Sequence, residues 1–159
     1  MITVSKALEV VAKAVEPLDA ERLPLAKALG RVSATSVEAR VSLPPFRQSA
    51  MDGYALRARD TRDATPDTPE RFDIVGEIPA GRIDNPPIIG AGEAVRIFTG
   101  AQLPPGADSV VRQEKTRREG ETLVITESVA EGNDVRPVGE ELERQTQIIA
   151  EGERLDERH

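Results

Sequence analysis

The sequence predicts an α+β fold that is mostly β, in which an elongated domain of helices and extended segments is interrupted by a β-rich domain. Three observations support this prediction. Helical periodicity is confined to the N-terminal part, the middle consists of short Val- and Ile-rich runs divided by Gly and Pro, and the last part returns to extended chain. We place the elongated domain at residues 1–46 and 136–159, and the inserted β-rich domain at residues 47–135.

The N-terminal segment has the pattern of an amphipathic helix. Its apolar residues recur at helical spacing and form one stripe, made of Val4, Leu8, Val11 and Val15. Thr3 or Ser5 can cap the start of this helix, and Pro17 is expected to end it. A shorter helix is predicted over residues 24–29, because Pro occupies its first turn and Gly30 follows it at the position that favours a left-handed residue.

The remaining elements are predicted to be strands and loops. Residues 32–41 have an extended pattern that leads into the rigid Pro44-Pro45 corner, and residues 60–70 are polar, contain two prolines and predict a mobile surface loop. Five further runs rich in Val and Ile predict strands, namely Phe72–Ile78, Glu93–Thr99, Asp108–Glu114, Glu121–Val129 and Gln147–Ala150.

Composition excludes several classes of function. The net charge of −7 and the aromatic content of 3% disfavour nucleic acid or an anionic membrane surface as the main partner. There is no cysteine, which excludes disulfides and thiolate metal sites, and the single histidine is the terminal His159. No apolar run approaches the length of a membrane span, so a cytoplasmic protein is the expectation.

The most informative motif places Asp52 directly before Gly53, among small and apolar residues. Asp-Gly is typical of a tight turn, because Gly reaches positive φ at no steric cost. Such a turn would hold the Asp52 carboxylate at a fixed angle at the lip of a cleft. A plain hairpin turn is the structural alternative.

A second polar motif, Thr99-Gly100, ends the predicted strand at residues 93–99. It exposes a hydroxyl and a backbone N–H together, and an oxyanion could be received there. The alternative is that Thr99 only satisfies the hydrogen bonds of a turn. Neither a G-x-G-x-x-G motif nor a Walker lysine motif is present, so nucleotide binding of those kinds is not supported.

A third motif couples Arg136 to the acidic pair Glu140-Glu141, which follows Gly139. Two carboxylates near a strand end could bind Mg²⁺ through oxygen ligands. A solvated run of charges explains the same residues equally well in so acidic a chain.

Together these motifs resemble the molybdopterin molybdenumtransferase family, which is known as MoeA in bacteria and as the E-domain of gephyrin in animals. The resemblance covers the whole chain and follows the order and spacing of that family. It rests on Pro44-Pro45-Phe46, Ser49-Ala50-Met51-Asp52-Gly53-Tyr54-Ala55, Val95-Arg96-Ile97, Thr99-Gly100-Ala101, Leu103-Pro104-Pro105-Gly106-Ala107-Asp108, Val110-Val111, Gln113-Glu114 and Gly139-Glu140.

The resemblance implies a function for the parent protein. The family inserts molybdenum from molybdate into adenylylated molybdopterin and releases AMP with the help of a divalent cation, expected to be Mg²⁺. The chain resembles only the N-terminal and β-rich region, without the pterin-binding α/β domain and the C-terminal barrel. A homodimer is implied, with a cleft shared with the α/β domain of the other subunit, and the fragment alone is expected to be inactive. The alternative is a non-catalytic dimerisation or binding module.

The resemblance also assigns candidate site residues. It implies catalytic roles for Asp52 and Thr99, substrate binding by Ser49, Gly100 and Arg136, and metal binding by Asp52 and Glu141. The chain departs from the family pattern in three places, which involve four residues. Glu141 stands where an Asp is usual, Arg47-Gln48 replaces a common Asp-Asn, and Lys115 replaces a frequent acidic residue.

Overall fold

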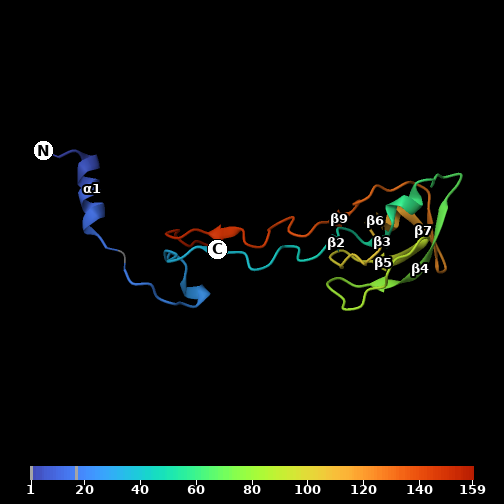
Figure 1. Ribbon diagram of the computed structural model, residues 1–159, viewed down its shortest axis with the longest axis horizontal. Helices are drawn as coiled ribbons and strands as arrows, with labels where there is room; N and C mark the ends of the chain where they lie inside the picture. Colours follow the sequence, from blue (N-terminus) through green and yellow to red (C-terminus); the bar gives the residue numbers. More distant parts are fainter. Residues whose placement is uncertain (1, 17) are drawn as a thin grey trace. The chain divides into compact units, whose positions relative to one another are not determined.

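A computed structural model describes residues 2–16 and 18–159 of the chain. By its internal contacts the chain divides into two compact units (Figure 1). Unit 1 comprises Met1–Val37 and Gln147–His159, and unit 2 comprises Glu38–Thr146. Unit 2 is therefore continuous in sequence, whereas unit 1 is made of both ends of the chain. The division expected from the sequence, after residues 46 and 135, stays a prediction.

Unit 1 contains the α-helix of the described residues, α1 (Val4–Ala14). As predicted, Thr3 is the N-cap, and its hydroxyl accepts a hydrogen bond from the Lys6 N–H at 3.3 Å. Pro17, which the sequence predicts to end the helix, lies outside the described residues. None of the helices in the described part of the chain is long and apolar enough to cross a membrane.

The predicted second helix is wrong in extent. Only one 3₁₀ turn, η1 (Leu25–Lys27), forms within residues 24–29, although Gly30 does adopt the expected positive φ of 77°. Backbone hydrogen bonds then hold two segments of unit 1 together in extended form. The Gly30 N–H donates to the Leu155 carbonyl and the Leu155 N–H donates to the Arg31 carbonyl, both at 2.8 Å. After η1 the chain therefore pairs with a segment that is distant in the sequence instead of continuing as a helix.

Unit 2 is built on a six-stranded sheet with the strand order β6-β3-β5-β4-β8-β7. Neighbouring strands are antiparallel except for β4 and β5, which are parallel. Two pairs of short strands, β1 with β10 and β2 with β9, form separate two-stranded sheets. The bounds of the strands are β1 Val37–Glu38, β2 Gln48–Ser49, β3 Gly53–Leu56, β4 Glu70–Ile78, β5 Glu93–Ile97, β6 Ser109–Arg112, β7 Thr116–Glu119, β8 Thr122–Ile125, β9 Val135–Arg136 and β10 Gln147–Ile149.

The core of unit 2 lies on both faces of this sheet. Successive residues of a strand point to opposite faces, so Tyr54 and Ala55 of β3 belong to two different apolar clusters. One cluster contains Ala55, Ile78, Val95, Ile97 and Val110, and the other contains Tyr54, Leu56, Phe72, Leu123 and Ile125. Every residue of β3 is buried as a result.

The sequence prediction of the Asp52-Gly53 turn needs correction. Gly53 is the first residue of the central strand β3, and its φ does not lie in the left-handed region. Glycine is required for a different reason, because a Cβ atom at Gly53 would lie 2.1 Å from the carbonyl oxygen of Val111. The neighbouring strand β6 therefore approaches at the point where the side chain is missing.

The polar segment at residues 60–70 is more ordered than the sequence predicts. It begins within the 3₁₀ turn η2 (Ala58–Thr61), and Thr61 and Ala64 are buried. The Thr61 hydroxyl donates to the Ala58 carbonyl and accepts from the Val129 N–H at 2.9 Å. Buried hydrogen bonds thus fasten the start of the predicted loop to unit 2.

Candidate functional site

The structure brings Asp52 and Thr99 together, although they are 47 residues apart in the sequence. Asp52 immediately precedes β3, Thr99 follows β5, and these two strands are antiparallel neighbours with Gly53 opposite Ile97. Thr99 donates two hydrogen bonds to Asp52 Oδ1, from its backbone N–H at 2.8 Å and from its hydroxyl at 2.7 Å. The two candidate catalytic residues therefore form one unit.

The Asp52 carboxylate is held in its charged form. The backbone N–H of Thr99 lowers the pKa of Asp52 most, the Thr99 hydroxyl lowers it further, and the charge of Arg96 adds to the effect. Both bonds go to Oδ1, and no hydrogen bond among the described residues engages Oδ2. One oxygen is thus fixed and the other is left to bind a cation or a water molecule.

Ser49 and Gly100 lie next to this pair but bond to each other. The Gly100 N–H donates to the Ser49 carbonyl, and the Ser49 N–H donates to the Ala101 carbonyl, both at 2.9 Å. Ser49 is fully buried, and its hydroxyl donates to the Met51 carbonyl at 2.5 Å. An oxyanion that used the Gly100 N–H would have to displace the Ser49 carbonyl.

Arg136 reaches this region through the backbone. It is paired with Gln48 in the β2–β9 sheet, next to the pair formed by Ser49 and Val135. Its guanidinium donates to Glu140 Oε2 at 2.5 Å and also to Glu141, and these two partners raise the pKa of Arg136. Arg136 and Glu141 are therefore together, with Arg136 shared between two carboxylates, and no hydrogen bond among the described residues links Glu141 to Asp52.

The donor set at this point suits part of a magnesium site. Within residues 2–16 and 18–159, no group of three or more His, Cys, Asp or Glu side chains could hold a metal ion. Mg²⁺ in enzymes usually keeps several waters and binds through one or two carboxylates together with phosphate oxygens of the substrate. Asp52, with Oδ2 free of hydrogen bonds in the described chain, fits as one such carboxylate rather than as a complete site.

Arg47 and Lys115, two of the residues that depart from the family pattern, contact partners other than Asp52. The Arg47 guanidinium donates to the Asp108 carbonyl at 3.3 Å, and the Lys115 ammonium lies 3.8 Å from a carboxylate oxygen of Glu127. A cavity of about 460 Å³ lies beside the end of β3 opposite Asp52, and neither Asp52 nor Thr99 lines it. Its lining includes Arg57, Arg59, Arg62 and Asp108.

Sequence reasoning assigned no role to Arg96, which lies on β5 beside the pair. The guanidinium carbon is 5.2 Å from the ring centre of Tyr54 and 4.9 Å from that of Phe98. It donates to the Gly53 carbonyl at 3.2 Å and to Gln113 Oε1 at 2.5 Å. An arginine between the apolar residues Val95 and Ile97, two residues before an aromatic on the same face, was the available signal.

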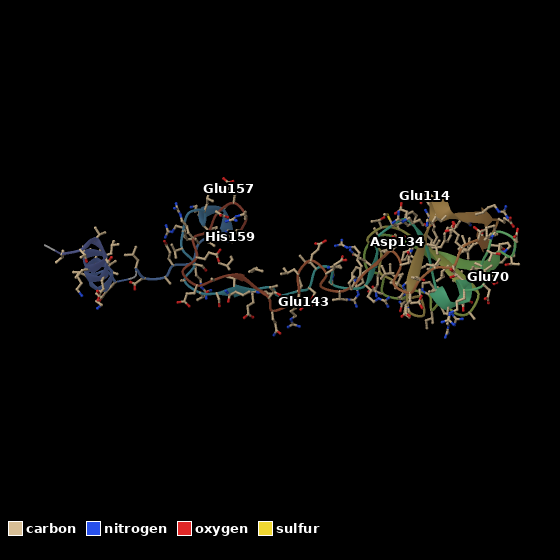
Figure 2. The ribbon with its side chains drawn as sticks, turned by 90° about the horizontal axis from the view of Figure 1, so that it is seen from above. Glu70, Glu114, Asp134, Glu143, Glu157 and His159 are labelled. Carbon is tan, nitrogen blue, oxygen red and sulfur yellow. The ribbon has the colours of Figure 1, made fainter. Side chains whose placement is uncertain are left out.

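Asp134 also supports the site and was not identified from the sequence. It has a positive φ of 50°, and its carbonyl accepts from the Ala50 N–H at 2.9 Å, in the segment that leads to Asp52. Its carboxylate forms a two-point pair with Arg112, which lowers the pKa of Asp134. In Figure 2, Asp134 and Glu114 lie on the same side of unit 2, away from Glu70 at the start of β4.

A family model described as the MoeA N-terminal region, comprising its domains I and II, matches residues 2–159. The chain belongs to the MoeA N-terminal family. This finding confirms the resemblance inferred from the motifs, and the mostly β fold with one α-helix in its described part is that of a MoeA-type chain.

Known relatives of this MoeA-type chain are longer. It is 36% identical over 141 residues to the molybdopterin molybdenumtransferase of Synechococcus elongatus, covering 87% of this chain and 34% of the relative. It is 37% identical over 153 residues to molybdopterin molybdenumtransferase 2 of Mycobacterium tuberculosis, covering 96% and 38%. The crystal structure of a molybdopterin biosynthesis moeA protein from Pyrococcus horikoshii OT3 superposes with a TM-score of 0.86 at 32% identity, covering 97% of this chain and 41% of that one.

Proposed function

We propose that this chain is the N-terminal portion of a molybdopterin molybdenumtransferase and forms one wall of its active cleft. The parent protein would insert molybdate-derived molybdenum into adenylylated molybdopterin and release AMP. The Asp52–Thr99 pair is the observation that carries the proposal, because it supplies an oriented carboxylate inside a region that matches the family from residue 2 to residue 159.

The chemistry of the proposed reaction explains why such a pair is useful. Molybdate and the phosphate groups of the pterin substrate are both anionic, so their approach requires a cation and hydrogen-bond donors to offset the repulsion. Bound Mg²⁺ would supply that positive charge. Asp52 would hold it through Oδ2, while Thr99 keeps Oδ1 fixed so that the carboxylate does not rotate.

The remaining candidate residues would act around this pair. Ser49 and Gly100 fix the backbone of the loops that carry Asp52 and Thr99. Gly100 is partly exposed and would meet substrate directly, whereas Ser49 is fully buried and would meet it only after this backbone opens. Arg136 would bind an anionic group of the substrate only after release from Glu140 or Glu141. We further propose that the parent is a homodimer in which an α/β domain of the other subunit completes the cleft, so that this chain alone is inactive.

The test uses the parent protein and measures Mg²⁺-dependent release of AMP in the presence of molybdate. Asp52→Asn keeps the size of the side chain but removes its charge, and we expect turnover to fall by about 100-fold, the scale of a lost ligand or its support. Asp73→Asn is the matched control, since Asp73 is exposed on β4 and should leave turnover unchanged. Full activity of Asp52→Asn would rule out the proposed role.

A second function, a dimerisation or binding module, is favoured by the surface of α1. No residue of α1 is buried, and the side chains of its apolar stripe remain exposed, with Leu8 at 65% and Val11 at 58%. Sedimentation of the chain at micromolar concentration tests this function. Self-association that is lost in Leu8→Ser would support it, and a strictly monomeric chain would argue against it.

A further inference from the structure

Arg96 occupies an unusual position for an arginine. Its neighbours on β5, Val95 and Ile97, are fully buried, while Arg96 itself is only partly exposed. The rings of Tyr54 and Phe98 lie within 5.2 Å and 4.9 Å of its guanidinium carbon. Arginine stacks on aromatic faces in this way, and two faces restrict its planar group more than one does.

The two hydrogen bonds of Arg96 go to Gly53 and Gln113, which both contact the backbone of Asp52. One runs to the carbonyl of Gly53, the residue that follows Asp52 in the chain. The other runs to the side chain of Gln113, whose N–H in turn donates to the Asp52 carbonyl at 3.1 Å. Arg96 therefore contacts the residue directly after Asp52 and, through Gln113, supports the hydrogen bond to the Asp52 carbonyl, which links β3, β5 and the start of the 3₁₀ turn η3 (Gln113–Lys115).

We propose that Arg96 is the positioning residue of the Asp52–Thr99 site. It acts through its planar guanidinium group, which stacks on two aromatic rings and donates two hydrogen bonds. Asp52 lies at a bend before β3, and its carboxylate is fixed on one side only, by Thr99. Without Arg96, the peptide that carries this carboxylate loses the contacts that set its direction relative to β5. The use of that carboxylate rests on the proposed function, but the positioning itself does not.

Amide hydrogen exchange in this chain tests the positioning directly. The Thr99 N–H reports on the bond to Asp52 Oδ1, and the Gln113 N–H reports on the bond to the Asp52 carbonyl. In Arg96→Met, which keeps a long apolar side chain, we expect both amides to exchange about tenfold faster, the scale of one weakened hydrogen bond. The Ile89 amide, bonded to the Pro105 carbonyl, should change by less than about twofold.

Further variants separate positioning from charge and from folding. Arg96→Lys keeps the charge but not the planar fork, so it should behave like Arg96→Met. Phe98→Leu removes one stacking face, keeps Arg96, and should produce the same pattern to a smaller degree; it also serves if Arg96→Met does not fold. Arg118→Met is the matched control, because Arg118 lies on the remote strand β7 and bonds to Gly120 and Glu121 in the turn that follows it.

The outcomes distinguish this inference from the proposed function. Unchanged exchange at Thr99, equal acceleration at Ile89, or full rescue by Arg96→Lys would each overturn the positioning role. In the parent protein, Arg96→Met should lower kcat about tenfold with little change in KM. If exchange at Thr99 accelerates while kcat is unchanged, Arg96 positions Asp52 as inferred, and the catalytic use of Asp52 is what fails.

Discussion

The two units of this chain differ in whether their apolar side chains are buried or exposed. Among residues 2–16 and 18–159, all of the buried hydrophobic residues belong to unit 2, where they fill both faces of the six-stranded sheet. In the described part of unit 1, no side chain is buried, and large apolar residues such as Leu18 and Leu25 are 96% and 77% exposed. One unit has a core of its own, whereas the other presents its apolar residues outward.

This difference indicates which unit has a rigid core of its own and which unit depends on a partner to bury its apolar side chains. Burial of apolar surface is the main stabilising contribution to a fold, so unit 2 can stand on its own packing. The Asp52–Thr99 pair is built on β3 and β5 of that unit, which suits a site that needs fixed geometry. Unit 1 has the surface expected of a segment that packs against a partner.

The largest effect is expected from a substitution in the core of unit 2, compared with a similar substitution on the exposed helix of unit 1. Phe72 is 2% exposed in β4, and Phe72→Ala should lower the free energy of unfolding of unit 2 by about 3–5 kcal/mol. Leu8→Ala removes a similarly apolar side chain from α1, and should change the free energy of unfolding of unit 2 by less than about 0.5 kcal/mol. Urea unfolding followed by circular dichroism measures both, and similar losses in the two variants would refute the comparison.

A second prediction concerns Gly53 at the start of β3. Gly53→Ala would place a Cβ 2.1 Å from the Val111 carbonyl oxygen, so strands β3 and β6 must separate there, at an expected cost of about 1–3 kcal/mol. In Gly90→Ala the new Cβ would meet only the end of the Glu93 side chain, at 3.0 Å, so the cost is limited to the hydrogen bond that Glu93 accepts from the residue 90 N–H. Equal melting temperatures for the two variants would show that the close approach is not rigid.

Gly53 also shows what the sequence could and could not predict. The Val- and Ile-rich strands were predicted because their pattern is local, and β4, β5, β6, β8 and β10 all lie within the predicted ranges or within two residues of them. The central strand β3 was missed, because its sequence Gly-Tyr-Ala-Leu is short and follows an Asp-Gly pair that is typical of turns. What makes it a strand is burial by β5 and β6, which is not a local property.

The candidate site likewise contains some residues that the local sequence predicts and others that it does not. Asp52 and Thr99 were found through their motifs, and the antiparallel register of β3 and β5 brings them together. Arg96 and Asp134 received no role, because their importance depends on partners that are distant in the sequence, Gln113 for one and Ala50 for the other. The charged strand β7, Thr116–Glu119, was missed because it has no apolar alternation.

A third prediction uses pH to probe unit 2 near the site. The Arg112 guanidinium holds the pKa of Asp134 below its ordinary value, so this pair stabilises the fold above about pH 4 and the stabilisation is lost as the pH falls through the lowered pKa. Asn also tolerates the positive φ of position 134, so Asp134→Asn changes mainly the charge. We expect it to cost roughly 1 kcal/mol at neutral pH and less as the pH falls below about 4, measured by urea unfolding across this range.

The smallest effect is expected from the cap of α1. This helix has 11 residues and no buried side chain, and helices of that length are marginal in water unless they pack against something. Thr3→Ala removes the hydroxyl that accepts from the Lys6 N–H, and should cost this unpacked helix only about 0.5 kcal/mol.

The chemical shifts of residues 4–14 should then move toward coil values, while the unfolding of unit 2 stays unchanged. Thr65→Ala is the control, since its hydroxyl bonds only to nearby residues within unit 2. If Thr3→Ala leaves α1 fully helical, a partner already holds the helix through the stripe that includes Leu8 and Val11. In that case α1 does not have the marginal stability of an isolated helix. Dilution would then be expected to melt α1 before unit 2, because only the helix depends on the concentration of that partner.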